Sequence, residues 1–262
     1  MAGPSRAASG SMTDEAVSAH PFDCGDFVAK ISFRFVGPST PVPRLLLSLL
    51  RRLDAVGFSF EFVNTQVPPE EQYLKERIRG IFTVRKQSTL AVALIINKIV
   101  SRLRDHEAFV NIGVLHGFTL FAGMVGNRDK RCVGVDNSER VAAPDGPFMK
   151  RFHRLRSECQ EFHAVSYEEY FDRVHRGPIG FYVYDADHGY EHQLRNLLLA
   201  ERFFSDRCLV MIDDANAPQA RQATQDFLSR STHRYETLLD VRTPSDRHLT
   251  FWNGTWLLRK RG

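Results

Sequence analysis

The sequence of 262 residues contains few cysteines, and none of them belongs to a recognisable metal or redox motif. The four are Cys24, Cys132, Cys159 and Cys208, and they form neither a Cys-x-x-Cys pair nor the spacing of a zinc site. This absence argues against cysteine-based metal binding. Free thiols in a reducing compartment explain the pattern best, because two of the four lie in apolar segments with the character of buried strands.

Long hydrophobic runs are also missing. No apolar stretch approaches the roughly 18 residues that cross a membrane, and the N-terminus lacks the charged-then-hydrophobic pattern of a signal peptide. We therefore expect a cytoplasmic protein without a membrane partner. Residues 1–20 begin with a stretch rich in Ala, Gly and Ser and are expected to be a disordered leader.

The sequence has no extended block of charge of one sign. Its formal net charge is only +4, and basic side chains often stand beside acidic ones. The single basic run, Arg259–Arg261, is short and lies at the C-terminus. This pattern is typical of a solvated surface and not of a nucleic-acid-binding stripe, so we expect no nucleic-acid partner.

From residue 88 onward the sequence alternates between strand-like and helix-like segments. Strands are expected at residues 108–114, 132–135, 162–165, 180–184, 208–212, 235–241 and 250–258. Helices are expected at residues 88–103, 118–124, 148–156, 167–174, 190–203 and 219–229, the first of them capped by Ser88 or Thr89. Strict alternation with short connections predicts an α/β fold with a parallel sheet covered on both faces. The last two strands share only a short loop and must form an antiparallel hairpin.

Residues 21–87 form an N-terminal segment with a different pattern. Leucines within 45–53 recur at helical spacing, which predicts a helix with an apolar face that packs on something. This segment is expected to be a cap, a substrate lid or a dimerisation surface, and the last possibility makes a homodimer an open alternative.

A glycine-containing turn follows the first strand of the alternating region. Gly113 and Gly117 stand between that strand and a helix, where glycine lets the backbone approach a ligand. Asp136 ends the next strand, at the position where an acidic side chain can accept the hydroxyls of a ribose. A tight turn explains the glycines equally well when they are taken alone, but the added aspartate favours a nucleoside-binding site.

The run Asn-Ile-Gly-x-x-x-Gly-x-Thr at residues 111–119 resembles motif I of the class I S-adenosylmethionine (SAM) dependent methyltransferases. The resemblance implies a doubly wound, Rossmann-like sheet of seven strands, the last antiparallel, with residues 88–262 as the SAM-binding domain. It implies that the cofactor is bound by Asn111, Gly113, Gly117, Thr119, Asp136 and Ser166. Asn111 stands where the family normally has Glu or Asp. Ser166 is equally well explained as a helix cap.

Acidic residues cluster after the fourth and fifth strands of the alternating region. Residues 184–191 contain Asp185 and Asp187, and residues 210–216 contain Asp213 and Asp214. The carboxyl ends of neighbouring parallel strands lie at one edge of a sheet, so these carboxylates are expected to converge there. Four crowded acids repel one another unless a cation joins them, and a hard divalent ion coordinated by oxygen is the simplest candidate.

The two acidic clusters resemble the metal-dependent O-methyltransferases of natural products, especially the branch acting on macrolide and aminocoumarin sugars. The resemblance covers residues 88–212 and the Asp pair that follows. It implies that Asp185, Asp213 and Asp214 bind Mg²⁺, with Asp187 as the first candidate for the base and His188 as the second. The implied activity is Mg²⁺-dependent methylation by SAM of a hydroxyl on a sugar, oligosaccharide or glycosylated metabolite.

Three alternatives remain open from the sequence. Asp185 and Asp187 can cap the following helix, and the Asp213–Asp214 pair can form a turn. A metal-independent or hydroxylase-like relative would use the acidic edge differently. A scaffold that binds SAM without catalysis is the third alternative, favoured by Asn111 in place of an acid.

Overall fold

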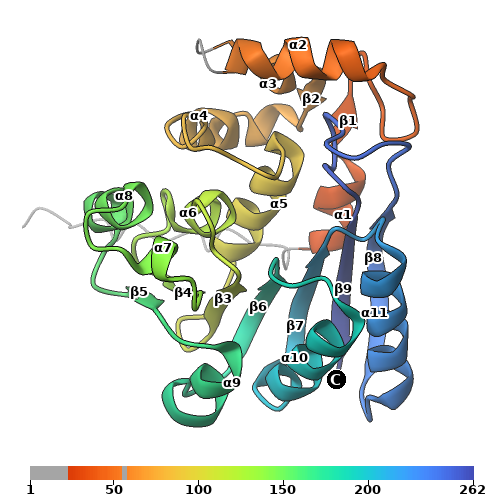
Figure 1. Cartoon of the computed structure of the whole chain (residues 1–262). Helices are drawn as coiled ribbons and strands as arrows, with labels where there is room; N and C mark the ends of the chain where they lie inside the picture. The colour runs from red at the N-terminus through yellow and green to blue at the C-terminus, as the bar shows by residue number, and fades with distance from the viewer. Residues whose placement is uncertain (1–22, 55–57) are drawn as a thin grey trace, which may run out of the picture.

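A seven-stranded sheet forms the centre of the computed structural model, which describes residues 23–54 and 58–262 (Figure 1). Its strands are β3 (Ala108–Ile112), β4 (Arg131–Val135), β5 (Gln160–His163), β6 (Ile179–Tyr184), β7 (Phe204–Asp213), β8 (Arg234–Val241) and β9 (Thr255–Arg261). Their order is β5-β4-β3-β6-β7-β9-β8, in which β3 to β7 run parallel and β9 is antiparallel to both neighbours. The predicted fold class and the antiparallel last strand are confirmed. The expected leader at residues 1–20 lies outside the described residues.

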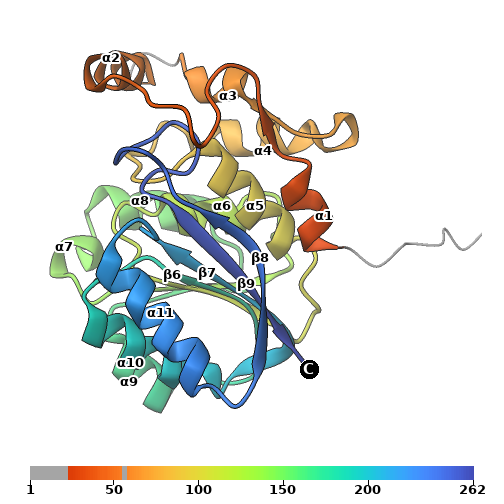
Figure 2. The ribbon, with the colours of Figure 1, turned by 90° about the vertical axis from the view of Figure 1, so that its right-hand side faces the viewer.

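Helices cover both faces of the sheet (Figures 1 and 2). One face carries α5 (Leu90–Val100), α6 (Phe118–Met124), α7 (Glu139–Ala142) and α8 (Pro147–Leu155), and the other carries α9 (Tyr167–Glu169), a π-helical turn (Tyr170–Val174), α10 (Tyr190–Glu201) and α11 (Pro218–Arg230). Successive strand residues alternate between two cores, so that Phe181 packs on the α5 side and Tyr182 on the α10 side. This alternation follows from the period of two in a strand and fixes the register of the buried strands.

Several expected boundaries differ from the structure by a few residues, and two of the differences have a clear physical reason. The last strand begins at Thr255 and not at residue 250, because residues 250–254 form a turn in which Gly254 has a φ of +87°. The helix expected at residues 167–174 is a single α-helical turn that continues as a π-helical turn. Both differences concern backbone geometry, which hydrophobic periodicity does not report.

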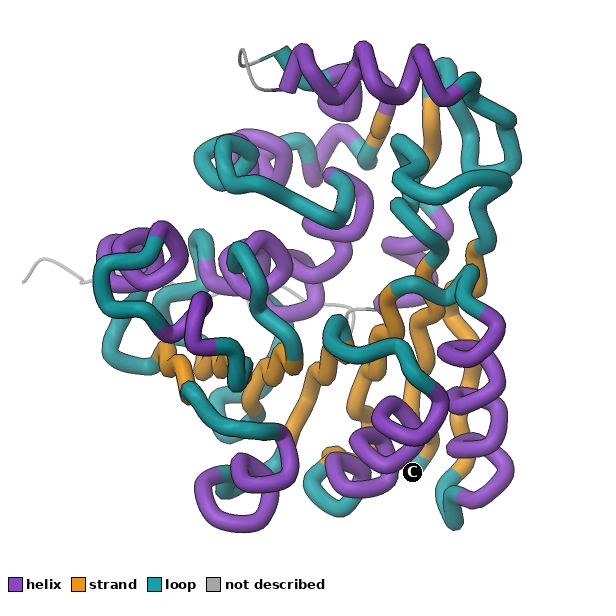
Figure 3. Tube along the Cα trace, viewed as in Figure 1, coloured by secondary structure: helices purple, strands orange, loops and turns teal. Residues whose placement is uncertain are grey.

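The N-terminal segment lies over the carboxyl ends of the parallel strands, at the top of Figure 1 (Figure 3 traces the same view). It contains α1 (Cys24–Ala29), β1 (Ser32–Phe33), α2 (Arg44–Asp54), α3 (Phe60–Asn64), β2 (Thr65–Gln66), a 3-10 turn (Pro69–Glu71) and α4 (Tyr73–Arg79). Side chains of α1 and α4 join the core on the α5 side of the sheet. This segment and the sheet domain therefore share one core.

The leucines of α2 divide between a buried and an exposed face. Leu45 is 87% exposed and Leu49 is 57% exposed, whereas Leu47 is buried. The exposed leucines therefore have no cover within the described part of the chain. A role for these leucines between two copies of the chain stays a prediction.

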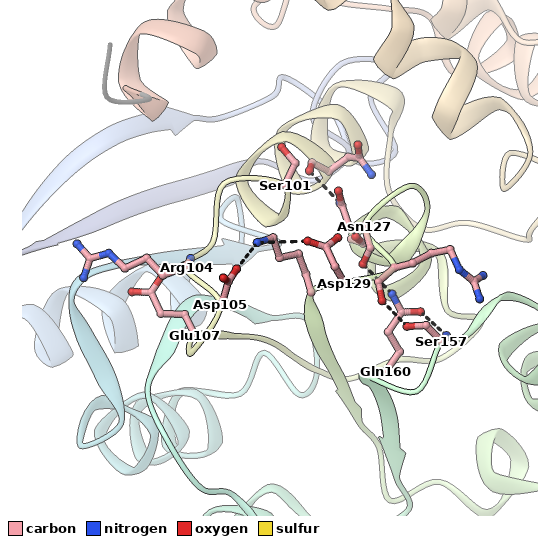
Figure 4. A network of polar contacts seen from close by, with 12 residues as sticks. Ser101, Arg104, Asp105, Glu107, Asn127, Asp129, Ser157 and Gln160 are labelled. Carbon is pink, nitrogen blue, oxygen red and sulfur yellow. Dashed lines mark hydrogen bonds and ion pairs between the residues drawn. The ribbon is translucent and has the colours of Figure 1, made fainter. Parts of the chain in front are cut away.

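Polar contacts tie together the loops at the opposite edge of the sheet, where the strands β3, β4 and β5 begin (Figure 4). Lys130 Nζ lies 3.0 Å from Asp105 Oδ1, and Gln160 Nε2 donates to the Asn127 carbonyl oxygen at 3.1 Å. Three of the four cysteines are buried, and all four are free thiols. No helix in residues 23–54 or 58–262 is long and apolar enough to cross a membrane.

The start of α5 is capped by a distant side chain and not by Ser88 or Thr89, as the sequence had suggested. Glu61, which is 1% exposed, accepts a hydrogen bond from the Leu90 backbone N–H at 2.6 Å. Its other carboxylate oxygen forms an ion pair with Lys86. Glu61 therefore connects α3, the segment before α5 and the start of α5 itself, where a negative charge is favourable.

We predict that Glu61→Gln lowers the free energy of unfolding by about 3 kcal/mol, because it leaves the Lys86 charge buried without its carboxylate. Urea denaturation followed by circular dichroism measures the change. Glu76→Gln is the control, since the Glu76–Arg79 ion pair on α4 is exposed and its loss should leave the midpoint unchanged. Equal midpoints for the two variants would contradict a structural role for Glu61.

Candidate active site

A cavity of about 670 Å³ opens at the carboxyl ends of β3, β4, β6 and β7. This is the edge where a doubly wound sheet offers a ligand site. Nine residues that the sequence singled out line it: Gly113, Thr119, Asp136, Ser166, Asp185, Asp187, His188, Asp213 and Asp214. Asn111 and Gly117 do not line it. Nine of the eleven candidate residues therefore line one cavity, although their motifs are far apart along the chain.

Gly113 occupies a position that accepts no side chain. Its φ is +82°, and an added Cβ would lie 2.0 Å from the carbonyl oxygen of Asp185. The Gly113 N–H donates to the Val135 carbonyl oxygen at 2.9 Å, which holds the turn against β4. Glycine is required here by both the backbone conformation and the contact with the end of β6.

Gly117, expected to contact the cofactor, does not line the cavity. Gly117 begins α6 in the left-handed conformation, with a φ of +90°, and an added Cβ would lie 2.4 Å from the Phe121 ring. This glycine therefore starts the helix and permits close packing beneath the turn. Its contribution to the cavity is indirect.

Asn111 is fully buried near the end of β3 and hydrogen-bonds to the glycine turn. Its Nδ2 donates to the Gly113 carbonyl oxygen at 2.9 Å. Its Oδ1 is buried and accepts no hydrogen bond within the described part of the chain. An unsatisfied buried oxygen is costly, which leaves Oδ1 as an acceptor for a donor that reaches the turn.

Asp136 holds the glycine turn as well as lining the cavity. Its Oδ2 accepts the backbone N–H groups of Val114 at 2.9 Å and Leu115 at 3.0 Å, and its Oδ1 accepts that of Ser138 at 2.9 Å. A carboxylate offers about four acceptor positions, so at least one remains for a hydroxyl.

Ser166 caps a helix, as the sequence allowed, and a contact with the cofactor stays a prediction. Its Oγ accepts a hydrogen bond from the Glu169 N–H at 3.2 Å, which caps α9, and the residue also lines the cavity. A capping role and a ligand contact are compatible, because a hydroxyl oxygen can accept one hydrogen bond while its proton points elsewhere.

Asp185 and Asp213 make a carboxyl–carboxyl contact at the ends of β6 and β7. Their side chains lie beside each other, and Thr119 Oγ1 donates to Asp185 Oδ2 at 3.3 Å. Burial raises the pKa of Asp185 to about 7, with the charge of Asp214 adding to the effect. Burial and both neighbouring carboxylates raise the pKa of Asp213 well above its usual value. Two carboxyl groups in contact can hold a shared proton or a cation between them.

Asp214 and His188 form a second pair in the cavity. Asp214 Oδ2 lies 3.3 Å from His188 Nε2, while Asp214 Oδ1 is buried without a hydrogen bond in the described residues. Burial raises the pKa of Asp214, and the nearby His188 opposes this shift. The other ring nitrogen of His188, Nδ1, is also buried and has no partner in residues 23–54 and 58–262.

Asp187 is more exposed and holds the turn before α10. Its Oδ1 accepts the Gly189 N–H at 2.8 Å, and its Oδ2 lies 3.9 Å from His192 Nε2. This contact supports the capping interpretation of Asp187. Asp185 does not share that role, because its carboxylate contacts Thr119 and Asp213.

The three carboxylates expected to bind a metal have different neighbours. Asp185 and Asp213 face each other, whereas Asp214 faces His188. Across the residues that the structure describes, no group of three or more His, Cys, Asp or Glu side chains is arranged to hold a metal ion. The assignment of the three carboxylates as Mg²⁺ ligands stays a prediction.

The cavity also contains residues that the sequence analysis missed. Arg85, Gln87 and Ser88 approach it from the segment before α5, and His116 and Tyr167 lie beside the turn and α9. Ser88 is 1% exposed, and its Oγ has no hydrogen bond among the described residues. Of these residues, only Ser88 was noticeable in the sequence, as a possible helix cap. No motif covers residues 82–87, so nothing in the sequence placed Arg85 and Gln87 in the cavity.

Comparison with known proteins agrees with this geometry. Residues 110–215 match the family model described as a methyltransferase domain. No curated protein matches the chain. Among solved structures, the chain is similar to a cofactor-bound protein from MTB, with 14% identity and a TM-score of 0.54 over 85% of this chain and 99% of that one. It is also similar to the O-methyltransferase TomG from Streptomyces achromogenes in complex with SAM, with 16% identity and a TM-score of 0.50 over 81% and 99%.

The region that matches the family model runs from the strand before the glycine turn to the end of the acidic pair. It therefore supplies both halves of the cavity described above. Residues 110–215 thus match a methyltransferase domain model, and the chain has the fold of solved SAM-dependent O-methyltransferases such as TomG.

Proposed function

We propose that the protein transfers the methyl group of SAM to a hydroxyl of a sugar, oligosaccharide or glycosylated metabolite. One observation carries the proposal: a single cavity joins a nucleoside-type site, made by Gly113 and Asp136, to a buried acidic edge. The solved relative TomG, described as an O-methyltransferase in complex with SAM, supports this choice of cofactor and reaction. A non-catalytic scaffold would not need the charged edge, which is costly to bury.

The acceptor hydroxyl needs a base, since its pKa is far above neutral. We propose His188 for this role in preference to Asp187. Asp214 orients the His188 ring through Nε2 and leaves Nδ1 without a partner among the described residues, whereas the Asp187 carboxylate is held by the Gly189 N–H. A histidine whose other nitrogen faces a carboxylate is a common arrangement for proton transfer.

We further propose that a divalent cation such as Mg²⁺ is held by Asp185, Asp213 and Asp214. The donor set fits a hard cation, because all three groups supply carboxylate oxygens in a buried place. Asp214 Oδ1 has no hydrogen bond in the described residues, so it can bind a cation while Oδ2 keeps its contact with His188. The cation would supply positive charge that stabilises the developing alkoxide.

A metal-independent form of the same reaction is the second candidate. The contact between Asp185 and Asp213 favours it, because one shared proton relieves their repulsion without a cation. In that form His188 and Asp214 alone prepare the hydroxyl.

We predict that Gly113→Ala weakens SAM binding by at least about tenfold, because a Cβ would displace the carbonyl of Asp185 and distort the turn. Isothermal titration calorimetry with SAM measures the affinity. Gly177→Ala is the matched control, since Gly177 also has a positive φ, of +87°, but no atom within 4 Å of an added Cβ. Unchanged SAM affinity in a folded Gly113→Ala variant would contradict the site.

We predict that His188→Gln lowers kcat by about 10²-fold or more and leaves the Kd for SAM unchanged, because it removes the base and not the cofactor site. Asp187→Asn should lower kcat much less. Release of S-adenosylhomocysteine, followed with sugar hydroxyl acceptors, measures kcat. The reverse order of effects would identify Asp187 as the base.

We predict that Mg²⁺ binds more tightly at pH 8 than at pH 6. The pKa of Asp185 is raised to about 7, so a proton competes with the cation at the lower pH and is lost at the higher one. Calorimetry with Mg²⁺ alone measures the affinity, and Asp213→Asn should weaken it. Turnover that survives a chelator unchanged would favour the metal-independent reaction.

A further inference from the structure

A second cavity of about 720 Å³ adjoins the first. Three segments build it: α2 through Arg51, residues 82–87, and residues 246–253 between β8 and β9. Arg85 and Gln87 line both cavities, so the two spaces meet along the segment before α5. All the residues that line this second cavity lie outside the part of the chain that matches the methyltransferase family model.

Specific contacts hold the walls of the second cavity together. The Arg51 guanidinium lies over the Trp252 ring at 4.1 Å from its centroid and donates a hydrogen bond to the Arg247 carbonyl oxygen. His248, which is fully buried, has Nε2 at 2.9 Å from the Thr40 carbonyl oxygen. These contacts hold the N-terminal segment against the loop before β9. The walls of the cavity between them are therefore positioned by specific interactions.

The lining of the second cavity has an excess of positive charge. It contains Arg51, Arg85, Lys86 and Arg247 but only one acidic residue, Asp246. Glu61 neutralises Lys86. The guanidinium groups of Arg85 and Arg247 are exposed and form no ion pair or hydrogen bond with the residues that the structure describes. Two guanidinium groups at one cavity favour an oxyanion, which they can bind with paired hydrogen bonds.

We propose that the second cavity binds the methyl acceptor, and that this acceptor carries an oxyanion, a phosphate or a carboxylate, which Arg85 and Arg247 bind. The inference rests on the methyl transfer proposed above. It accounts for the position of the cavity, because Asn253 lines it and lies beside Asp214 of the acidic edge. An acceptor anchored by its anion among the arginines can thus extend a hydroxyl toward His188.

The volume of the cavity agrees with an acceptor larger than one sugar ring. Ligand sites for small molecules range from about 300 to 1,000 Å³, and this one lies in the upper part of that range. The Trp252 ring and Phe82 supply apolar surface beside the arginines. An acceptor with a ring, an anion and a free hydroxyl satisfies all of these features.

The test uses three acceptors that share a phenyl ring and vicinal sugar hydroxyls: phenyl glucoside, phenyl glucuronide and phenyl glucoside 6-phosphate. Calorimetry on the full chain saturated with S-adenosylhomocysteine measures their binding without turnover. We expect the glucuronide, the phosphate or both to bind at least about tenfold more tightly than the neutral glucoside. The stronger of the two identifies the preferred oxyanion.

Variants connect this preference to the arginines. Arg247→Asn should abolish the preference for the anion while leaving the affinity for the neutral glucoside unchanged, and asparagine tolerates the φ of +60° at this position. Arg85→Gln provides a second, independent variant in an exposed segment. Arg242→Ala is the matched control, because it removes the same charge from the same loop without altering the cavity lining.

The outcomes separate this inference from the proposed function. Equal affinities for all three acceptors, or a preference that survives both arginine variants, would overturn the anion site; methylation of phenyl glucoside would in that case leave the proposed function intact. Preferential binding of the anionic acceptors that depends on Arg247, without release of methylated product, would support the anion site and count against methyl transfer.

Discussion

The ends of β3 and β6 approach each other so closely that no side chain fits between them. An added Cβ at Gly113 would lie 2.0 Å from the carbonyl oxygen of Asp185. This contact places the glycine turn and the first acidic residue in the same cavity. Asn111 supports it from below through the Gly113 carbonyl oxygen, and Thr119 supports it from α6 through the Asp185 carboxylate. The nucleoside-type and acidic parts of the site share this single point of close packing.

The acidic edge differs from the other charged regions of the molecule. At the opposite edge of the sheet Asp105 faces Lys130, and in the N-terminal segment the buried Glu61 faces Lys86. Asp185 and Asp213 instead face each other, and burial raises both pKa values. An arrangement that lowers the stability of the ionised protein is expected where a ligand, a proton or a cation completes the site. The absence of a basic partner among the described residues therefore sets Asp185 and Asp213 apart from these structural acids and supports the role proposed for them.

The sequence predicted those parts of the site that depend on local patterns. Asp185 and Asp213 are separated by a helix, yet their meeting followed from the rule that parallel strands end at one edge. Contacts between distant segments carried no such signal: Glu61 caps α5 at Leu90, and Arg51 stacks on Trp252. The same limit applies to Gly117 and to the start of β9, where packing and backbone geometry decide.

The two cavities are lined largely by different parts of the chain, and this separation would let one fold accept different methyl acceptors. The residues that we propose for methyl transfer lie within residues 110–215, where the glycine turn and the acidic pair adjoin the buried strands. The second cavity depends on α2, residues 82–87 and the loop before β9, which meet through a few contacts such as Arg51 with Trp252. Loops and peripheral helices can change without disturbing the buried strands. Selection for a new acceptor would thus act on the arginine-rich walls and leave the glycine turn and the carboxylates in place.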